Sequence, residues 1–282
     1  MKVVLAGAFG KLGTDILKDL LKKGHEVVAA DLNIDNASKI EGNFTSVKID
    51  VTNKETLVGL FDGADYAIST VGLTGTSATI TNYDIDLNGN INLLEEAKTA
   101  NLKGFTYISV IKADTAPSVP MLDAKAKFEE KLKGSGIPYV IHRPTGYFYD
   151  IAKVFMPMIE KGQVTLLGKF NVSANVVDTP DFASFIVDKM CEKNITYDVG
   201  GKETYTYEEI ARMFFLAAGK EAVIKRAPVF LFDVLAYVNK RKKNGKEAII
   251  RFSKWTLTNE LVGKDKVGEG SFSHYIKSCY NK

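Results

Sequence analysis

A glycine-rich turn near the amino terminus lies within VVLAGAFGKLGTDIL, residues 3–17. Residues 3–6 form a short apolar run typical of a buried strand, and apolar residues recur at helical spacing over residues 12–21. The turn between them has the pattern GxxGxxG from Gly7 to Gly13. Glycines there let the backbone turn sharply and approach a phosphate closely, while the start of the helix offers free N–H groups. The stretch therefore predicts a strand, a phosphate-binding turn and a helix.

An acidic residue follows this turn at the spacing typical of dinucleotide-binding proteins. Asp31 ends the second apolar run, residues 27–30, about 20 residues after the turn. A carboxylate at this place accepts hydrogen bonds from the hydroxyls of an adenosine ribose. A 2′-phosphate would be repelled there, and the Leu32-Asn33 stretch after Asp31 contains no arginine, so NAD is favoured over NADP, although Lys11 remains a candidate phosphate contact. A purely structural turn with a helix-capping aspartate is the competing interpretation.

Short apolar runs alternate with helical stretches through the first half of the chain. Continuous apolar strands are typical of a parallel sheet that is covered by helices on both faces. The sequence thus predicts an α/β fold, a Rossmann-type doubly wound parallel sheet, over residues 1–150. Residues 151–282 are expected to form a smaller mixed α/β substrate lobe with closing helices, interwoven with the sheet domain. The further elements expected are strands at residues 47–49, 66–69, 105–109, 139–142, 164–167 and 175–177, and helices at residues 54–61, 88–100, 123–133, 151–160 and 180–190, with Thr206 as the N-cap of one more.

The composition excludes several classes of function. The 282 residues are 45% hydrophobic and 25% charged, the balance of a soluble globular protein, and a net charge of +3 gives no reason to expect a nucleic-acid partner. Two separated cysteines, Cys191 and Cys279, predict neither a disulfide nor a zinc site and suit a cytoplasmic location. The three histidines lack i, i+4 spacing, so no metal site is expected. No run reaches the roughly 18 apolar residues of a membrane span, and the N-terminal run is too short for a signal peptide.

Further motifs occur in a fixed order after the glycine turn. They are Asp50-Val51, Ser69-Thr70-Val71-Gly72, the run from Asp86 to Glu95 (DLNGNINLLE), Tyr107-Ile108-Ser109, Arg143-Pro144 and Val199-Gly200-Gly201. Together with the turn, these motifs resemble those of the atypical and extended short-chain dehydrogenase/reductase superfamily, particularly its NmrA-like and NAD-dependent epimerase-like branches. The resemblance covers roughly residues 1–215 and implies an NAD(P)-binding Rossmann fold.

The resemblance also implies roles for individual residues. Asp31 would hold the adenosine ribose, Lys125 would hold the nicotinamide ribose, and Ser109 at the end of a strand would orient the substrate. The competing interpretation of Ser109 is a strand-end serine that satisfies a local backbone group. The implied cofactor contacts are Gly7, Phe9, Gly10, Lys11, Leu12, Gly13, Asp31, Asp50, Val51, Thr70, Val71, Gly72 and Lys125.

One position departs from the pattern of the superfamily. There, a Tyr-x-x-x-Lys pair carries out the proton transfer, but Met121 stands four residues before Lys125, and a thioether cannot exchange a proton. The candidate catalytic residues are therefore Lys125, Ser109 and Tyr147, with Tyr147 as the nearest substitute phenol and Tyr83 as a weaker one. Packed aromatic side chains are the competing interpretation for both tyrosines. His142, at a strand end near the expected substrate, is interpreted as a buried strand histidine rather than a catalytic base.

Three functions agree with these patterns. The first is an NAD(P)-dependent oxidoreductase that carries out hydride transfer on a small organic substrate, in a direction that the sequence leaves open. The second is a non-catalytic, NmrA-like dinucleotide sensor or assembly protein, which the methionine favours. The third is a nucleotide-sugar epimerase or dehydratase, which the missing tyrosine disfavours because those reactions need a proton shuttle. The sequence leaves the oligomeric state open.

A basic run, KRKKNGK at residues 240–246, follows the amphipathic stretch 229–238. We interpret it as a solvated loop between helices, with an anionic partner or a membrane surface as the alternative.

Overall fold

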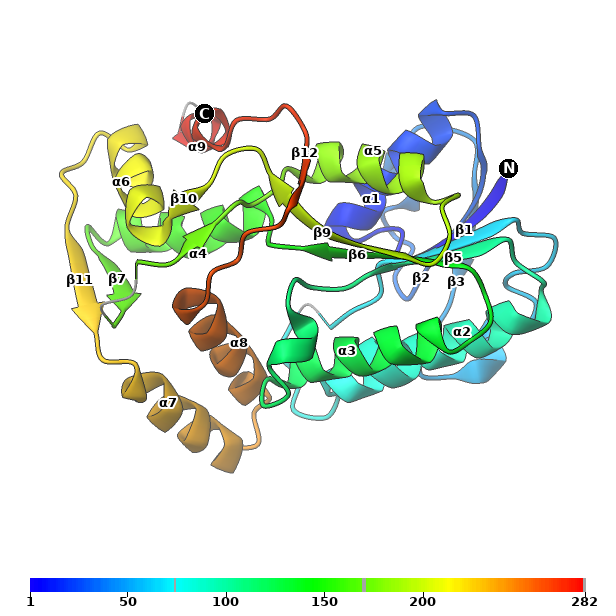
Figure 1. The fold of residues 1–282 in the computed structure, drawn as a ribbon, viewed down its shortest axis with the longest axis horizontal. Coiled ribbons are helices and arrows are strands. Elements are labelled where there is room, and N and C mark those ends of the chain that lie inside the picture. Colours follow the sequence, from blue (N-terminus) through cyan, green and yellow to red (C-terminus); the bar gives the residue numbers. More distant parts are fainter. Residues whose placement is uncertain (74, 169–170, 281–282) are drawn as a thin grey trace. The chain divides into compact units, whose positions relative to one another are not determined.

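The central sheet contains eight strands, in spatial order β12 (Asp265–Val267), β9 (Ile195–Gly201), β6 (Tyr139–Pro144), β5 (Gly104–Ile108), β4 (Tyr66–Ser69), β1 (Lys2–Ala6), β2 (Glu26–Asp31) and β3 (Thr45–Lys48) (Figure 1). The ladders that join β1 to β2, β2 to β3, β1 to β4, β4 to β5, β5 to β6 and β9 to β12 are parallel. The chain order reverses between β1 and β4, and ligands of such sheets bind beyond the carboxyl ends of the strands at this point. The predicted doubly wound parallel sheet is confirmed.

The computed structural model describes residues 1–73, 75–168 and 171–280. The chain forms two units that interleave along the sequence. The first unit is made of Met1–Gly75, Thr79–Arg143 and Phe182–Tyr197, and the second of Thr76–Ala78, Pro144–Asp181 and Asp198–Lys282.

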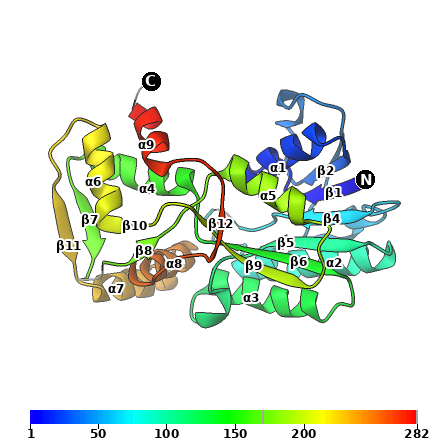
Figure 2. The same ribbon diagram turned by 45° about the horizontal axis from the view of Figure 1, so that its top comes forward.

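Helices cover both faces of the sheet in the first unit. Figures 1 and 2 show α1 (Lys11–Lys22) on one face together with the part of α5 (Thr179–Lys189) that belongs to this unit. On the opposite face lie α2 (Asn90–Thr99) and α3 (Pro120–Lys133). An ion pair of 2.7 Å between Lys23, just after α1, and Asp188 of α5 joins the two helices of the first face.

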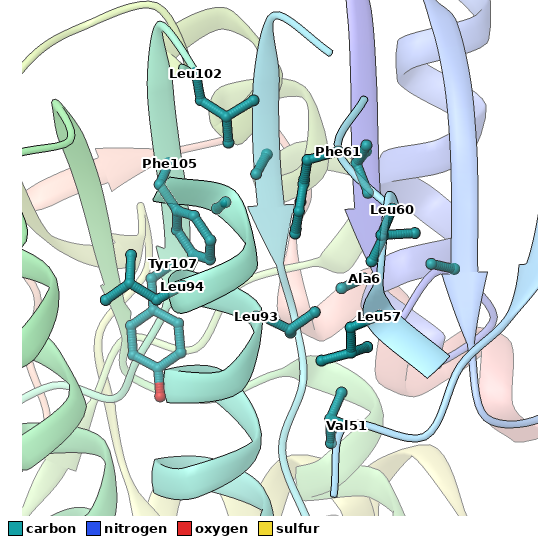
Figure 3. Close-up of a cluster of buried hydrophobic side chains, with 14 of the residues drawn as sticks. Ala6, Val51, Leu57, Leu60, Phe61, Leu93, Leu94, Leu102, Phe105 and Tyr107 are labelled. Carbon is teal, nitrogen blue, oxygen red and sulfur yellow. The ribbon is translucent and has the colours of Figure 1, made fainter. Parts of the chain in front are cut away.

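The core of the first unit lies between the sheet and α2 and α3 (Figure 3). Phe105 and Tyr107 of β5 pack against Leu93 of α2 and Phe128 of α3, and none of the four is more than 1% exposed. The rings of Tyr107 and Phe128 meet edge to face with their centroids 4.5 Å apart. Burial of each such side chain contributes about 1.5–3 kcal/mol to the stability of the fold. The alternating inward positions of β5 therefore fix α2 and α3 against the sheet.

The helix predicted at residues 54–61 is wrong. Only a single 3₁₀ turn, η2 (Lys54–Leu57), forms, because Val58 has a non-helical ψ of 125° and Gly59 adopts a left-handed φ of 72°. An α-helix cannot continue through a residue in that conformation. Leu57 and Phe61 are nevertheless buried in the core, which explains the helix-like spacing of apolar residues.

The helix predicted at residues 88–100 begins earlier and irregularly. A π-helical turn, η3 (Tyr83–Gly89), leads directly into α2. The side-chain amide of Asn90 donates to the carbonyl oxygens of Ile85 and Asp86, at 3.3 and 3.0 Å, and so satisfies groups that the wider turn leaves open. Gly89 is needed because a Cβ there would lie 2.6 Å from a methyl group of Val51.

The second unit is smaller and mixed in structure. Its two-stranded sheets pair β7 (Val164–Leu167) with β11 (Ile224–Ala227) and β8 (Ser173–Ala174) with β10 (Tyr205–Thr206). The strand expected at residues 175–177 is shifted, because only an isolated bridge joins Val177 to Tyr147. Thr206 is confirmed as an N-cap and forms a capping box with Glu209. The helices are α4 (Phe148–Glu160), α6 (Tyr207–Ala217), α7 (Phe230–Arg241), α8 (Lys246–Thr258) and α9 (Phe272–Tyr280).

Within the described ranges, no helix is both long enough and apolar enough to cross a membrane.

Candidate functional site

The glycine turn between β1 and α1 is closely packed on its inner side and open on its outer side. Gly7 has a φ of 80°, and a Cβ there would lie 2.4 Å from the hydroxyl oxygen of Thr70. A Cβ on Gly13 would lie 2.0 Å from the carbonyl oxygen of Gly7. Gly10, in contrast, is exposed and has no atom within 3.4 Å of its Cβ position. The turn thus brings backbone N–H groups at the start of α1 to an open surface that fits a pyrophosphate.

Asp31 is held directly beside this turn. Its Oδ2 accepts a 2.9 Å hydrogen bond from the N–H of Phe9, and its Oδ1 accepts one of 2.7 Å from Leu32. The helix-capping interpretation is wrong, because the next helical turn is η1 (Ala37–Lys39), whose N-cap is Asn36. A carboxylate accepts more than two hydrogen bonds, so Asp31 retains lone pairs for a ribose.

The other expected cofactor contacts follow the carboxyl ends of neighbouring strands. Asp50 comes after β3, with Oδ1 engaged by the N–H and hydroxyl of Thr52 at 2.9 and 2.7 Å. Val51 is buried against Gly89. Thr70 comes after β4 and donates a 3.0 Å hydrogen bond to the carbonyl oxygen of Gly7, which ties this loop to the glycine turn. Since these strands are parallel, the residues after them share one edge of the sheet. Of the remaining predicted contacts, Leu12 is buried, Phe9, Val71 and Gly72 are half-buried, and Lys11 is exposed.

Lys125 lies in α3 and is buried in a polar cluster at the same edge. Its Nζ is 3.2 Å from Oδ1 of Asp86 and donates to the carbonyl oxygen of Ile108 at 3.2 Å. The exposed fractions of the two side chains are 11% and 1%, so the ion pair is largely desolvated. A Cβ on Gly72 would lie 2.8 Å from the Asp86 carboxylate and 3.4 Å from Nζ. The loop after β4 therefore passes directly over the Lys125–Asp86 pair.

The hydroxyl of Ser109 is part of a different buried cluster. It donates a 2.5 Å hydrogen bond to Oε1 of Glu129, and the guanidinium of Arg143 binds the same carboxylate through Nε and Nη2 at 2.5–3.1 Å. Although partial burial alone would lower the pKa of Arg143, the bonds and charge of Glu129 raise it above its ordinary value. The donor capacity of Ser109 is thus used within the protein, and its role toward a substrate stays a prediction.

Three tyrosine hydroxyls have raised pKa values, those of Tyr83, Tyr107 and Tyr147, and a catalytic role of Tyr147 stays a prediction. The hydroxyl of Tyr83 donates to Asp123 at 2.7 Å, and burial together with this bond raises its pKa to about 12. Burial raises the pKa of Tyr107, whose hydroxyl is 3.4 Å from Nζ of Lys125, well above its ordinary value. Tyr147 lies in the second unit, where burial and the neighbouring Tyr149 and Asp150 also raise its pKa. Met121 is half-buried in the first turn of α3.

Asp86, Tyr107 and Glu129 belong to the site but were not predicted from the sequence as functional residues. Asp86 and Tyr107 were noted only as members of sequence motifs, and Glu129 lies in the helix predicted at residues 123–133. Their importance depends on tertiary contacts between α3, η3 and β5. The available signal was a charged residue at a core-facing position of a predicted helix, which is uncommon unless the charge is paired.

His142 lies in β6 and is fully buried, which confirms its interpretation as a buried strand histidine. Its ring stacks on Tyr197, with centroids 5.6 Å apart, and contacts Phe182 and Phe185 edge to face. Neither ring nitrogen has a hydrogen-bond partner among the described residues. Burial lowers the pKa of His142 from 6.5 to about 3, despite the opposing effect of Glu192.

This burial predicts a loss of stability in mild acid. The folded protein keeps His142 neutral down to about pH 3, whereas the unfolded chain binds a proton below about pH 6.5. The part of the free energy of unfolding that depends on neutral His142 is therefore complete above pH 6.5. It decreases as the pH falls, by about 2 kcal/mol at pH 5. Urea unfolding of the wild type and of His142→Phe at neutral pH and pH 5 measures it. The substitution should remove this part of the pH dependence, while His274→Gln, at an exposed position, should leave it unchanged.

No cluster of three or more His, Cys, Asp or Glu side chains suited to a metal ion occurs within residues 1–73, 75–168 and 171–280.

Comparison with known proteins defines the class. Residues 7–188 match the model of a protein family described as NAD(P)H-binding, and the chain belongs to this family. The NAD(P)-binding domain that the sequence resemblance implied is thereby confirmed.

The chain is also similar to curated proteins over most of its length. It is 26% identical over 243 residues to the photosystem II assembly factor Ycf39 of Trieres chinensis, covering 84% of this chain and 76% of that protein. It is 28% identical over 250 residues to the Ycf39 of Guillardia theta, and this alignment covers 84% of this chain and 77% of that protein.

Solved structures share the fold at lower identity. Citrobacter triphenylmethane reductase gives a TM-score of 0.77 at 17% identity and full coverage of both chains. The Escherichia coli NADPH-dependent quinone oxidoreductase in complex with NADPH gives a TM-score of 0.74 at 18% identity, and the match covers 99% of this chain and 100% of that one. The Thermus thermophilus UDP-glucose 4-epimerase in complex with NAD gives a TM-score of 0.67 at 22% identity, and the match covers 81% of this chain and 86% of that one.

Proposed function

We propose that this protein is an NAD(P)-dependent oxidoreductase that reduces a small organic substrate without a catalytic tyrosine. The observation that carries the proposal is the position of Lys125, buried against Asp86 directly beneath the loop at Gly72. The glycine turn and Asp31 suit the adenosine and pyrophosphate half of a dinucleotide, and Lys125 suits a polar group at the nicotinamide half. A bound nicotinamide dinucleotide supplies the hydride.

The site favours substrates that accept a hydride before they need a proton. Met121 replaces the usual proton donor, Ser109 donates to Glu129, and Tyr83 donates to Asp123. A quinone that accepts a hydride becomes a stabilised hydroquinone anion, which can take its proton from water. An extended cationic acceptor becomes a neutral product and needs no proton. An unactivated ketone would form a basic alkoxide and would need a donor in the site. We therefore expect quinone-like acceptors to be reduced much faster than simple ketones.

We further propose that NAD is the preferred cofactor, because Asp31 presents a carboxylate where NADP would place its 2′-phosphate. Asp31→Ala is expected to weaken NADH binding about tenfold, through loss of charge-assisted hydrogen bonds, and NADPH binding less. Fluorescence titration with both nucleotides measures this difference. Asp35→Ala removes the same charge at an exposed position nearby and should leave both affinities unchanged. A larger loss for NADPH than for NADH would refute the preference.

A second candidate is a dinucleotide-binding sensor or assembly protein that does not turn over its cofactor. Met121 favours it, and so does the similarity to proteins that are called assembly factors. An epimerase or dehydratase is disfavoured by the same methionine, since both reactions need a proton shuttle.

A reducing compartment such as the cytoplasm agrees with the free thiols of Cys191 and Cys279.

One experiment separates the two candidates. The protein is titrated with NADH and NADPH, and oxidation of the bound nucleotide is then followed across a panel of quinones, enones and ketones. Turnover with quinones above the uncatalysed rate supports the oxidoreductase. Tight binding without turnover across the panel would favour the sensor, and failure to bind either nucleotide would refute both.

A further inference from the structure

Helix α7 of the second unit exposes most of its apolar side chains. Eight of its twelve residues are apolar or aromatic, yet among these twelve only Ala236 is buried. Six large side chains are between 38% and 61% exposed, namely Phe230, Leu231, Val234, Leu235, Tyr237 and Val238. An ordinary surface helix buries its apolar stripe against the core, whereas α7 exposes its apolar stripe to solvent.

The exposed side chains form one continuous face. Their positions follow the spacing i, i+1, i+4, i+5, i+7 and i+8, which places them on one side of a helix. The opposite side contacts α8, since Ala236 is buried there and Asp233 forms an ion pair with Lys254 of α8 at 2.6 Å. The helical hairpin therefore fixes which side of α7 faces outward.

Basic residues continue this apolar face at its carboxyl-terminal end. Arg241 and Lys242 are four residues beyond Tyr237 and Val238 and so extend the same two rows of side chains. The guanidinium of Arg241 lies 4.9 Å from the centre of the Tyr237 ring. Lys242 is exposed and forms no ion pair with an acidic side chain in the part of the chain that the structure describes, and the same holds for Lys243 and Lys246.

We propose that α7 and the basic run after it form a peripheral docking site for an anionic lipid bilayer. A helix with an exposed apolar face lies in the plane of a membrane interface with that face among the acyl chains, and adjacent cations bind acidic headgroups. An apolar protein groove would match the six hydrophobic side chains but would leave the unpaired cations without a counter-charge. The acidic bilayer surface satisfies both parts of the site together.

Flotation with lipid vesicles tests this proposal. The full chain is mixed with vesicles of phosphatidylcholine and phosphatidylglycerol in equal parts, or with phosphatidylcholine alone, and the bound fraction is measured. We expect binding to the acidic vesicles that high salt weakens. The double variant Lys242→Glu/Lys243→Glu should lower the partition coefficient at least about tenfold. Val234→Glu/Leu235→Glu, which alters two exposed apolar residues, should lower it at least as much.

Controls separate docking from misfolding and from self-association. Leu216→Glu changes an apolar residue of α6 that is 77% exposed and should not affect vesicle binding. All variants should bind NADH and melt like the wild type, since the altered side chains are exposed. Equal binding to neutral and acidic vesicles, or none to either, would overturn the proposal. So would analytical ultracentrifugation that shows the α7 variants abolishing a dimer while vesicle binding is unchanged.

Discussion

Gly13→Ala is expected to lower the affinity for both NADH and NADPH about 100-fold. The new methyl group would lie 2.0 Å from the carbonyl oxygen of Gly7, so α1 must move away from the turn. Overpacking of this kind costs about 1–3 kcal/mol, and a 100-fold loss of affinity corresponds to about 2.7 kcal/mol. The displacement would also misplace the N–H groups at the helix start that bind the pyrophosphate. Calorimetric titration of the purified variant with each nucleotide provides the measurement.

Gly134→Ala is the matched control. It makes the same chemical change at the end of α3, where φ is −85° and the nearest atom to the new methyl group is 3.5 Å away. Its affinity should equal that of the wild type, and its thermal stability should change little. An unchanged affinity in Gly13→Ala would show that the nucleotide binds elsewhere.

Lys125→Met should both destabilise the fold and abolish turnover. The substitution leaves Asp86, 1% exposed, as a buried charge without its ion-pair partner, and such a loss costs about 3 kcal/mol. Adding Asp86→Asn removes that charge and should restore part of the stability, but it should not restore reduction of a quinone. Denaturant unfolding and nucleotide oxidation measure the two effects separately.

Lys127→Met is the control for this second experiment. Lys127 lies on the same helix and forms an ion pair with Asp123 at 2.6 Å, but its side chain is 53% exposed. An ion pair in solvent contributes about 1 kcal/mol or less. If Lys125→Met were no more destabilising than Lys127→Met, the account of a desolvated pair would be wrong. If Lys125→Met oxidised nucleotide at the wild-type rate, Lys125 would have no part in the reaction.

Features that depend on neighbouring residues in the chain could be predicted from the sequence. The glycine turn, the position of Asp31 at the end of a strand and the N-cap at Thr206 each depend on a few adjacent residues, and apolar runs located the strands from β1 to β6. The helix predicted at residues 54–61 failed for a local reason as well. A single glycine, Gly59, adopts a left-handed conformation, and hydrophobic spacing does not register it.

The polar clusters could not be predicted because they join residues that are distant in sequence. Lys125 meets Asp86, 39 positions earlier, across the space between α3 and η3, and nothing near Lys125 marks that partner. Ser109 was interpreted as facing a substrate, but Glu129 and Arg143 place it in a buried network. Such contacts depend on how helices pack on the sheet, and a pattern within one element does not contain this information.

A single-turnover experiment tests the central claim most directly. The protein is saturated with NADH and mixed with a quinone, and the absorbance of the reduced nicotinamide is followed in the wild type and in Lys125→Met. The account predicts rapid loss of absorbance in the wild type and a loss no faster than free NADH in the variant. Absorbance that persists in the wild type while NADH stays bound would contradict the assignment as an oxidoreductase.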